Sequence, residues 1–257
     1  MSSPCKELKR IARENLTGHY GIPMGALLAA SSISLVAILP FSLLQQEEQS
    51  VLQTVIFYVA YFLIFLITAV LSAGLMKLHL AMARKQPYDI SMVFYGFKNH
   101  PDRFILTALL LMFFMLAGLL PVIAGAVLLT VFKVTAGIIA AFVLLAVISL
   151  ILVVLFALQY ALSFFLVLEH PDMNAGCALR TSRELTKGHR GQLFYIFLSF
   201  LGLNLLSLIS FGIGSLWVAP YQSQTFAGFY LDVIGELPES SSQKPEASTY
   251  PSFNQYV

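Results

Sequence analysis

The sequence has little charge. Only 11% of its 257 residues are Asp, Glu, Lys or Arg, whereas 58% are hydrophobic and the mean hydropathy is +0.81. Soluble domains contain about 25% charged residues, so this chain lacks the polar surface that a protein needs to stay in water. A buried helix of a large soluble core is the alternative explanation for such a composition. It would need polar covering layers, which this sequence does not contain.

Cysteine and reactive motifs are also scarce. The two cysteines, Cys5 and Cys177, are not a spaced metal-binding pair and imply no disulfide framework. No nucleophile elbow, zinc-protease helix, phosphate-binding loop or dinucleotide fingerprint occurs. The net charge of +2 gives no reason to expect nucleic acid as a partner. We therefore expect no catalytic residue, no metal and no cofactor, and we expect that the protein is not an enzyme.

The charges that are present are clustered, and long apolar runs lie between them. No charged residue occurs from Phe104 to Phe132, from Val134 to Leu168 or from Gly191 to Leu231. Each run exceeds the roughly 20 apolar residues that a membrane span needs. We predict an all-α, polytopic membrane protein with spans at about residues 20–44, 51–82, 104–132, 136–168, 192–209 and 214–235. Pro121 is expected to kink the third span.

The last apolar run requires a break in its middle. Its 41 uncharged residues would form one helix about 60 Å long, twice the ~30 Å hydrocarbon core of a bilayer. Gly212 and Gly214 make a tight reversal easy, so we predict a hairpin of two spans and six spans in total. The competing interpretation is one tilted span followed by an interfacial helix. In that case the chain has five spans and its tail lies outside the cell.

Basic residues are concentrated on one side of the predicted spans. Those on this side are Lys6, Lys9, Arg10, Arg13, Lys77, Arg84, Lys85, Lys98, Arg103, Arg180, Arg183, Lys187 and Arg190. Only Lys133 lies on the opposite side. Because basic loops favour the cytoplasm, both termini are expected to be cytoplasmic in a multi-pass protein of the cell membrane. Residues 1–236 are predicted to form one membrane domain, and residues 237–257 a disordered cytoplasmic tail.

Three cytoplasmic segments share a pattern, and each precedes a predicted hairpin. They are residues 9–24, 91–106 and 179–194, and each contains a short amphipathic stretch that ends in Gly-His or Asn-His. We interpret them as three amphipathic helices that lie in the headgroup layer, with Gly or Asn as the helix stop before the span. A true threefold repeat and convergence on a common basic helix both explain the pattern.

Two groups of candidate functional residues come from these segments. Basic residues expected to contact anionic lipid headgroups or a protein interface are Lys9, Arg10, Arg13, Arg180, Arg183, Lys187 and Arg190. The repeated helix-end positions are His19, His100 and His189. These histidines suggest a shared metal site, but no Asp, Glu or Cys has ligand spacing. Helix capping or headgroup contact is therefore the expected role of the three histidines.

Polar residues are rare inside the predicted spans. Gln159 and Tyr160 in the fourth span, with Gln222 and Gln224 in the sixth, are the groups that could contact each other within the membrane. Hydrogen bonding between helices explains them more simply than a substrate path does. No ionisable residue lies at mid-depth in the four central spans, although such residues usually mark a transport path.

Part of the chain resembles a known family. Residues 178–189 (ALRTSRELTKGH), 211–221 (FGIGSLWVAPY) and 229–230 (FY) are similar to the bacterial integral-membrane family catalogued as domain of unknown function 975. Residues 9–20 and 97–99 fit the same pattern, so the resemblance covers most of residues 5–236. It implies a multi-pass protein of the bacterial cell membrane and no particular reaction. A looser similarity exists to the membrane portion of some glycerophosphodiester phosphodiesterases, whose soluble catalytic domain is absent here.

The leading hypothesis for function is a non-enzymatic membrane protein that acts through protein or lipid contacts. Such a protein would be a scaffold, an assembly factor or a regulatory subunit, with membrane lipids, anionic headgroups and a membrane protein as expected partners. The alternative is a transporter or permease for a small or amphipathic substrate, which a polar cavity between the fourth and sixth spans would favour. A membrane-embedded enzyme is the third hypothesis and would need polar groups that converge at one depth.

Overall fold

The structure, a computed structural model, describes residues 5–43, 50–132 and 135–237, and these residues contain helices and no strand. The first helices are α1 (Cys5–Leu16), α2 (Gly21–Leu43), α3 (Val51–Ala83), the 3-10 helix η1 (Ile90–Phe94), α4 (Tyr95–Lys98) and α5 (Pro101–Val131). They are followed by α6 (Ala136–Tyr160), α7 (Ser163–Glu169), α8 (Ala175–Leu185), α9 (Arg190–Ile209) and α10 (Ser215–Ile234). The predictions for Lys133 and for the tail after Leu237 fall outside the described residues.

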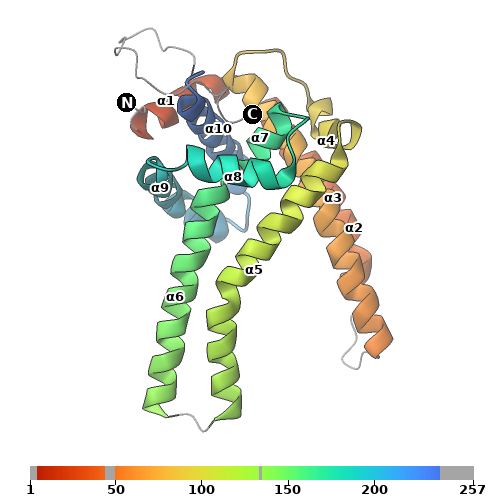
Figure 1. The fold of residues 1–257 in the computed structure, drawn as a ribbon. Helices are drawn as coiled ribbons and strands as arrows, with labels where there is room; N and C mark the ends of the chain where they lie inside the picture. The colour runs from red at the N-terminus through yellow and green to blue at the C-terminus, as the bar shows by residue number, and fades with distance from the viewer. Residues whose placement is uncertain (1–4, 44–49, 133–134, 238–257) are drawn as a thin grey trace.

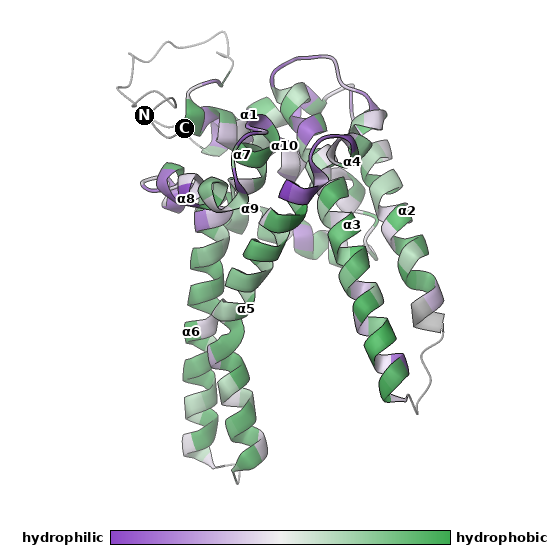
Figure 2. Cartoon of the chain, turned by 45° about the vertical axis from the view of Figure 1, so that its right-hand side comes forward, coloured by the Kyte–Doolittle hydropathy of each residue, from purple (hydrophilic) through white to green (hydrophobic). Residues whose placement is uncertain are grey.

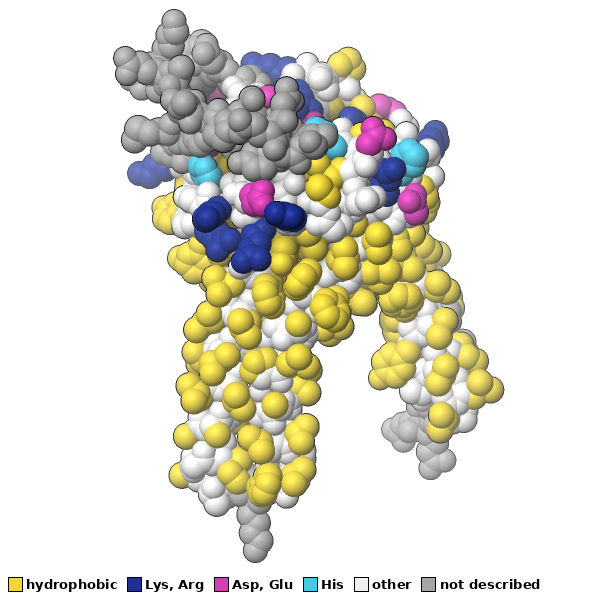
Figure 3. Space-filling view, in the orientation of Figure 1, with side chains coloured by type: hydrophobic (Ala, Val, Ile, Leu, Met, Phe, Trp, Pro, Cys, Tyr) yellow, Lys and Arg dark blue, Asp and Glu magenta, His cyan; other side chains and the backbone are white. Residues whose placement is uncertain are grey.

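Two long hairpins, α2–α3 and α5–α6, leave a common head and separate from each other with distance from it (Figure 1). Both hairpins are hydrophobic over almost their whole length (Figure 2). The space-filling view shows an open hollow between them, while the Lys, Arg, Asp and Glu side chains in view gather on the head (Figure 3). We use the term head for the end of the molecule formed by α1, η1, α4, α7 and α8.

Five helical segments are long and apolar enough to cross a membrane. Within the described residues they are Gly21–Pro40, Val51–Ala83, Pro101–Val131, Ala136–Glu169 and Arg190–Ile209. The helix α10, which the sequence predicts as a sixth span, is not among them. Its polar residues, Gln222, Ser223, Gln224 and Thr225, lower its hydropathy. The described part of the chain is therefore all-helical, with five candidate membrane helices.

The helices α5 and α6 pack closely because small residues lie between them. A Cβ atom at Gly118 would come within 3.0 Å of Val153, and one at Gly125 within 3.0 Å of Phe142. The Ser149 hydroxyl donates a hydrogen bond to the Gly118 carbonyl at 2.6 Å. Small residues and short polar contacts of this kind hold helices together in lipid, where apolar burial gives no driving force. The helix α5, which contains Pro121, changes direction near its middle (Figure 1).

The predicted break in the last apolar run is confirmed. The helix α9 ends at Ile209 and α10 begins at Ser215. Between them Gly212 has a φ of +85°, which strongly favours glycine. The Gly214 amide donates to the Ser210 hydroxyl at 2.9 Å, which stabilises the reversal. The returning helix α10 packs into the molecule, and its residues Phe229, Tyr230 and Leu231 are fully buried.

The first and third of the repeated segments form comparable helices. The helices α1 and α8 are each followed by a glycine with positive φ, +80° at Gly18 and +95° at Gly188. Their buried residues also match in position. These are Leu8, Ala12 and Leu16 in α1, and Ala178, Ser182 and Thr186 around α8. The apolar face of α1 packs against α10 and other helices, so protein covers the face that was expected to meet lipid.

The second repeated segment differs from the other two. It forms the short helices η1 and α4 in place of one amphipathic helix, and His100 itself takes the positive φ of +50°. Glycines bring this segment against α3. A Cβ atom at Gly96 would lie 2.6 Å from the Val70 carbonyl oxygen, and one at Gly74 would lie 2.1 Å from the Val93 carbonyl oxygen. Such close backbone contact leaves no room for the side chains of a regular helix.

Candidate functional site

A break in the membrane helix between α6 and α7 is bridged by hydroxyl groups from α8. Ala161 and Leu162 separate the two helices, which frees backbone groups at this point. The Ser182 hydroxyl donates to the Gln159 carbonyl at 2.9 Å and accepts from the Leu162 amide at 3.2 Å. The Thr186 hydroxyl lies 3.3 Å from the same carbonyl. Because buried backbone groups need partners, α8 completes the hydrogen bonding of the α6–α7 junction.

An ion network ties together the head ends of three helices. Arg84, which caps α3, pairs with Glu169 at the end of α7 and, at 2.5 Å, with Glu236 after α10. The Tyr230 hydroxyl donates to the other oxygen of Glu169 at 2.6 Å. The side chain of Glu169 is only 13% exposed, so loss of Arg84 would leave a largely buried carboxylate without its cation. Nothing in the local sequence pattern points to this network, because its members are far apart in the chain.

A second polar contact is buried between α3 and α10. The Nδ1 atom of His79 lies 3.2 Å from the side-chain amide of Gln224, and both residues are at most 4% exposed. With the amide nitrogen of Gln224 turned toward His79, its oxygen accepts from the Asn15 side chain of α1 at 3.2 Å. This contact therefore links α1, α3 and α10 beneath the head.

A cavity of about 230 Å³ lies next to this contact, among helices α3, α6, α7, α9 and α10. It is lined by Met76, His79, Ala157, Ala161, Phe165, Phe197, Ser223 and Phe226. His79 and Ser223 are its polar side chains, and no charged residue of the described chain lines it. The Phe197 ring packs on Phe226 with 4.8 Å between centroids and is still 38% exposed. The cavity thus reaches the molecular surface beside Phe197, and its lining suits an apolar group.

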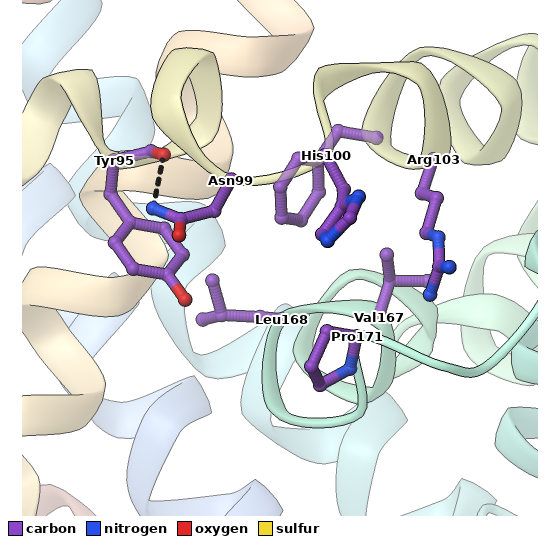
Figure 4. Close-up of a pocket in the computed structure, with 8 residues that line it drawn as sticks. Tyr95, Asn99, His100, Arg103, Val167, Leu168 and Pro171 are labelled. Carbon is purple, nitrogen blue, oxygen red and sulfur yellow. Dashed lines mark hydrogen bonds between the residues drawn. The ribbon is translucent and has the colours of Figure 1, made fainter.

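A smaller pocket lies in the head where the start of α5 meets the end of α7 (Figure 4). Tyr95, Asn99, His100 and Arg103 line one side, and Val167, Leu168 and Pro171 the other. The Asn99 amide donates to the Tyr95 carbonyl at 3.0 Å, and the Nη1 atom of Arg103 is buried with no hydrogen-bond partner in the described part of the chain. The pocket's volume of about 10 Å³ is that of roughly one water molecule, which is too small for an organic ligand.

Several of the predicted basic residues contact other parts of the protein. The Lys9 ammonium lies 4.2 Å from the centre of the Phe200 ring and donates to the Ser199 carbonyl at 3.4 Å. Its burial lowers the pKa of Lys9. Arg10 pairs with Glu7 and Glu14 within α1, and Arg180 pairs with Glu184 at 3.4 Å. The side chains of Lys9, Arg10 and Arg180 thus have partners within the protein itself.

The other predicted basic residues differ in their surroundings. Arg13 forms a side-chain hydrogen bond with Tyr221 of α10. Arg183 and Lys187 are exposed on α8 and directly after it. At the start of α9 the Nε atom of Arg190 is buried and has no hydrogen-bond partner among the described residues. Lys187 and Arg190 therefore mark the corner between α8 and α9, which is charged and close to the apolar surface.

The repeated histidines lie at the ends of different elements. His19 and His189 each follow a glycine of positive φ, whereas His100 precedes Pro101 at the start of α5. His19 uses its Nδ1 atom to contact the Thr17 carbonyl at 3.2 Å. Among the described residues no group of three His, Cys, Asp or Glu side chains is placed to hold a metal ion.

The predicted intramembrane polar residues have partners in several helices. Gln222 accepts a hydrogen bond from Asn204 of α9 at 3.5 Å, and Gln224 contacts His79 of α3. Tyr160 packs on Phe114 of α5 with 4.7 Å between ring centres. The backbone carbonyl of Gln159 is bound by Ser182. These contacts join helices, and the polar groups that line the cavity are His79 and Ser223 instead.

Comparison with known proteins gives one match. A model of the family described as "Protein of unknown function (DUF975)" matches residues 1–236. The match covers all of the described helices, from α1 to α10. No curated protein and no solved structure matches the chain.

Proposed function

The chain belongs to the family described as protein of unknown function (DUF975), and for this member we propose a non-enzymatic role that is carried out through contacts with lipids and with another membrane protein. The protein would act as a scaffold, an assembly factor or a regulatory subunit. The observation that carries this proposal is the separation of the two long hairpins, which leaves their apolar surfaces uncovered by protein (Figure 3).

The proposed topology has six spans in three hairpins, with the head and both termini in the cytoplasm. All described Lys, Arg, Asp and Glu residues lie in residues 5–14, 77–103, 169–190 and 232–236, and these segments hold 13 basic and nine acidic residues. A basic surface of this kind favours the cytoplasmic side of a cell membrane. With 20 residues, α10 is about 30 Å long and can cross the bilayer under cover of its neighbours.

The opening between the hairpins is the proposed binding site for the partner protein. Large side chains remain exposed on both of the helices that border the opening, for example Leu63 on α3 at 53% and Phe113 on α5 at 63%. In a bilayer such surfaces are covered by lipid or by helices of another protein. A partner helix in the opening would contact both hairpins at once, as a scaffold requires.

Crosslinking in native membranes tests the proposal. A photoreactive amino acid is placed at Leu63 and, separately, at Phe113, and a matched control is placed at Leu208 of α9, which is 74% exposed and belongs to neither long hairpin. We expect one protein to be crosslinked from both positions of the opening, to be absent from the control, and to co-purify in native lipid at a fixed ratio. Lipid adducts alone from all three positions, with no co-purifying protein, would contradict a partner in the opening.

Transport remains the second candidate, because the cavity touches both α6 and α10. Its lining of aromatic and aliphatic side chains, with His79 and Ser223 as the polar members, favours an apolar group over a polar permeant. A polar small molecule that co-purifies with the wild type, and is lost when Ala157 is replaced by Phe, would favour transport over the scaffold.

A further inference from the structure

We propose that the cavity beside Phe197 holds one acyl chain of an anionic phospholipid, whose phosphate group is bound by Lys187 and Arg190 at the corner between α8 and α9. This inference deepens the lipid-contact part of the proposed function and rests on it.

The cavity has the chemistry that an acyl chain needs. Its walls include Met76, Ala157, Phe165 and Phe226, and no charged side chain lines it. Transfer of an apolar chain from water into such a space is favourable, whereas a polar ligand would lose its hydration without compensation. The exposed Phe197 ring forms the rim, so a chain can enter from the surrounding bilayer without passing through the head.

The position of the basic corner fits a lipid headgroup. Arg190 and Phe197 are seven residues apart on α9, which is about two turns, so both side chains lie on the same face with Arg190 about 10 Å closer to the head. Phe197, at the rim of the cavity, is therefore below Arg190 along this helix. A phospholipid has the same order, with its phosphate at the membrane surface and its chains below.

The corner also contains a donor that lacks an acceptor. The Nε atom of Arg190 is buried, and no group in the described chain accepts its hydrogen. A buried guanidinium donor without a partner is costly, and a phosphate oxygen is a suitable acceptor for it. Lys187 is exposed three residues earlier. The acid that precedes them in the sequence, Glu184, pairs with Arg180.

Other basic residues of the head are less suitable. Lys9 lies against Phe200, and Arg10 and Arg84 each contact two carboxylates. A phosphate at any of these would compete with a protein partner. Lys187 and Arg190 form no ion pair in the described chain, and Arg190 precedes the rim of an apolar cavity along α9.

Lipid retention tests the site. The full chain is reconstituted with equal amounts of phosphatidylglycerol and phosphatidylcholine and extracted in mild detergent. Native mass spectrometry then identifies and counts the lipids that each chain retains. The variants are Ala157→Phe, which fills the cavity, and the double variant Lys187→Gln with Arg190→Gln, which removes the charges. The matched controls are Ala140→Phe, which adds the same bulk at an exposed position of α6, and Lys98→Gln, which removes a charge elsewhere in the head.

We expect the wild type and both controls to retain about one phosphatidylglycerol per chain. Ala157→Phe should lower the retained lipid of either type at least fivefold, and the charge variant should retain lipid without preference for phosphatidylglycerol. Unchanged retention by Ala157→Phe, with a folded protein by thermal unfolding, would overturn the cavity as the site. An unchanged preference in the charge variant would overturn the headgroup position, and a retained free fatty acid would overturn a phospholipid as the ligand. Crosslinking of a partner from Leu63 and Phe113 can succeed or fail independently of these results.

Discussion

The helices α1 and α8 have the same design in sequence and different roles in the structure. Both are short, both are followed by a glycine with positive φ, and the buried residues of each include three at spacings of four. In α1 these residues are aliphatic and pack against the returning helix α10. In α8 two of them carry hydroxyl groups, which bind the backbone at the break between α6 and α7. The pattern therefore sets the shape of the helix, and the buried side chains set what the helix does.

The largest effect is expected at the buried apolar face of α1. Leu16 is fully buried, so Leu16→Ala should lower the free energy of unfolding by about 2–5 kcal/mol. This is measured by titrating the purified protein in mild detergent with a denaturing detergent. Thr17→Ala is the neighbouring exposed control and should change it by less than about 0.5 kcal/mol. Similar small effects from both variants would mean that α1 does not depend on its buried face.

A smaller effect is expected where α8 acts through hydrogen bonds. Ser182→Ala leaves the Leu162 amide and the Gln159 carbonyl buried without this partner, which should cost about 1–3 kcal/mol. The reciprocal variant in α1, Ala12→Ser, adds a hydroxyl that can bond to a carbonyl of the preceding turn and should cost less than Ser182→Ala. The same denaturation titration applies. If the two variants were equally destabilising, the proposed difference between the helices would be lost.

Replacement of the glycine that follows each helix should lower the stability by the same amount, because α1 and α8 end in the same way. Gly18→Ala and Gly188→Ala add a Cβ atom that meets nothing within 4 Å, so each variant isolates the strain of positive φ, about 1 kcal/mol. Gly176→Ala, inside α8 and without positive φ, should be neutral or stabilising by up to about 1 kcal/mol. Thermal unfolding of the three single variants gives the comparison, and unequal effects at Gly18 and Gly188 would count against equivalent helix ends.

The smallest difference concerns access to the two cysteines, one in each helix. Burial raises the pKa of the Cys5 thiol, which also lies 3.6 Å from the Gln192 carbonyl, whereas Cys177 is exposed. A raised pKa means less thiolate at neutral pH, so a maleimide should label Cys177 about tenfold faster than Cys5. The rate at Cys5 should keep rising with pH up to its raised pKa. Cys177→Ser and Cys5→Ser isolate each thiol, and equal rates would contradict a buried α1.

The positions of the helices were largely predictable from the sequence. Runs without charge predict the long helices to within a few residues, because a bilayer requires such runs. The break after Ile209 was predictable because Gly212 and Gly214 are local signals. The break after Tyr160 was not, since the sequence there has no glycine or proline. It depends on Ser182, which lies more than 20 residues further along the chain.

The polar contacts were less predictable for the same physical reason. Arg84, Glu169 and Glu236 come together only through the packing of three helices. Likewise, His79 lies near the end of α3, and its buried contact with Gln224 requires α3 and α10 to pack side by side. Sequence pattern reports the face on which a residue lies, whereas its partner depends on the tertiary arrangement.

The break at the top of α6 has a consequence for the order of synthesis. The amide of Leu162 and the hydroxyl of Ser182 are 20 residues apart, so the end of α6 leaves the ribosome before the group that completes its junction does. Until α8 follows, the Gln159 carbonyl and the Leu162 amide must be hydrated or otherwise bonded, because neither can be left bare in lipid. The upper end of the α5–α6 hairpin thus takes its final form only after α8 has been made, although the hairpin below it can insert earlier.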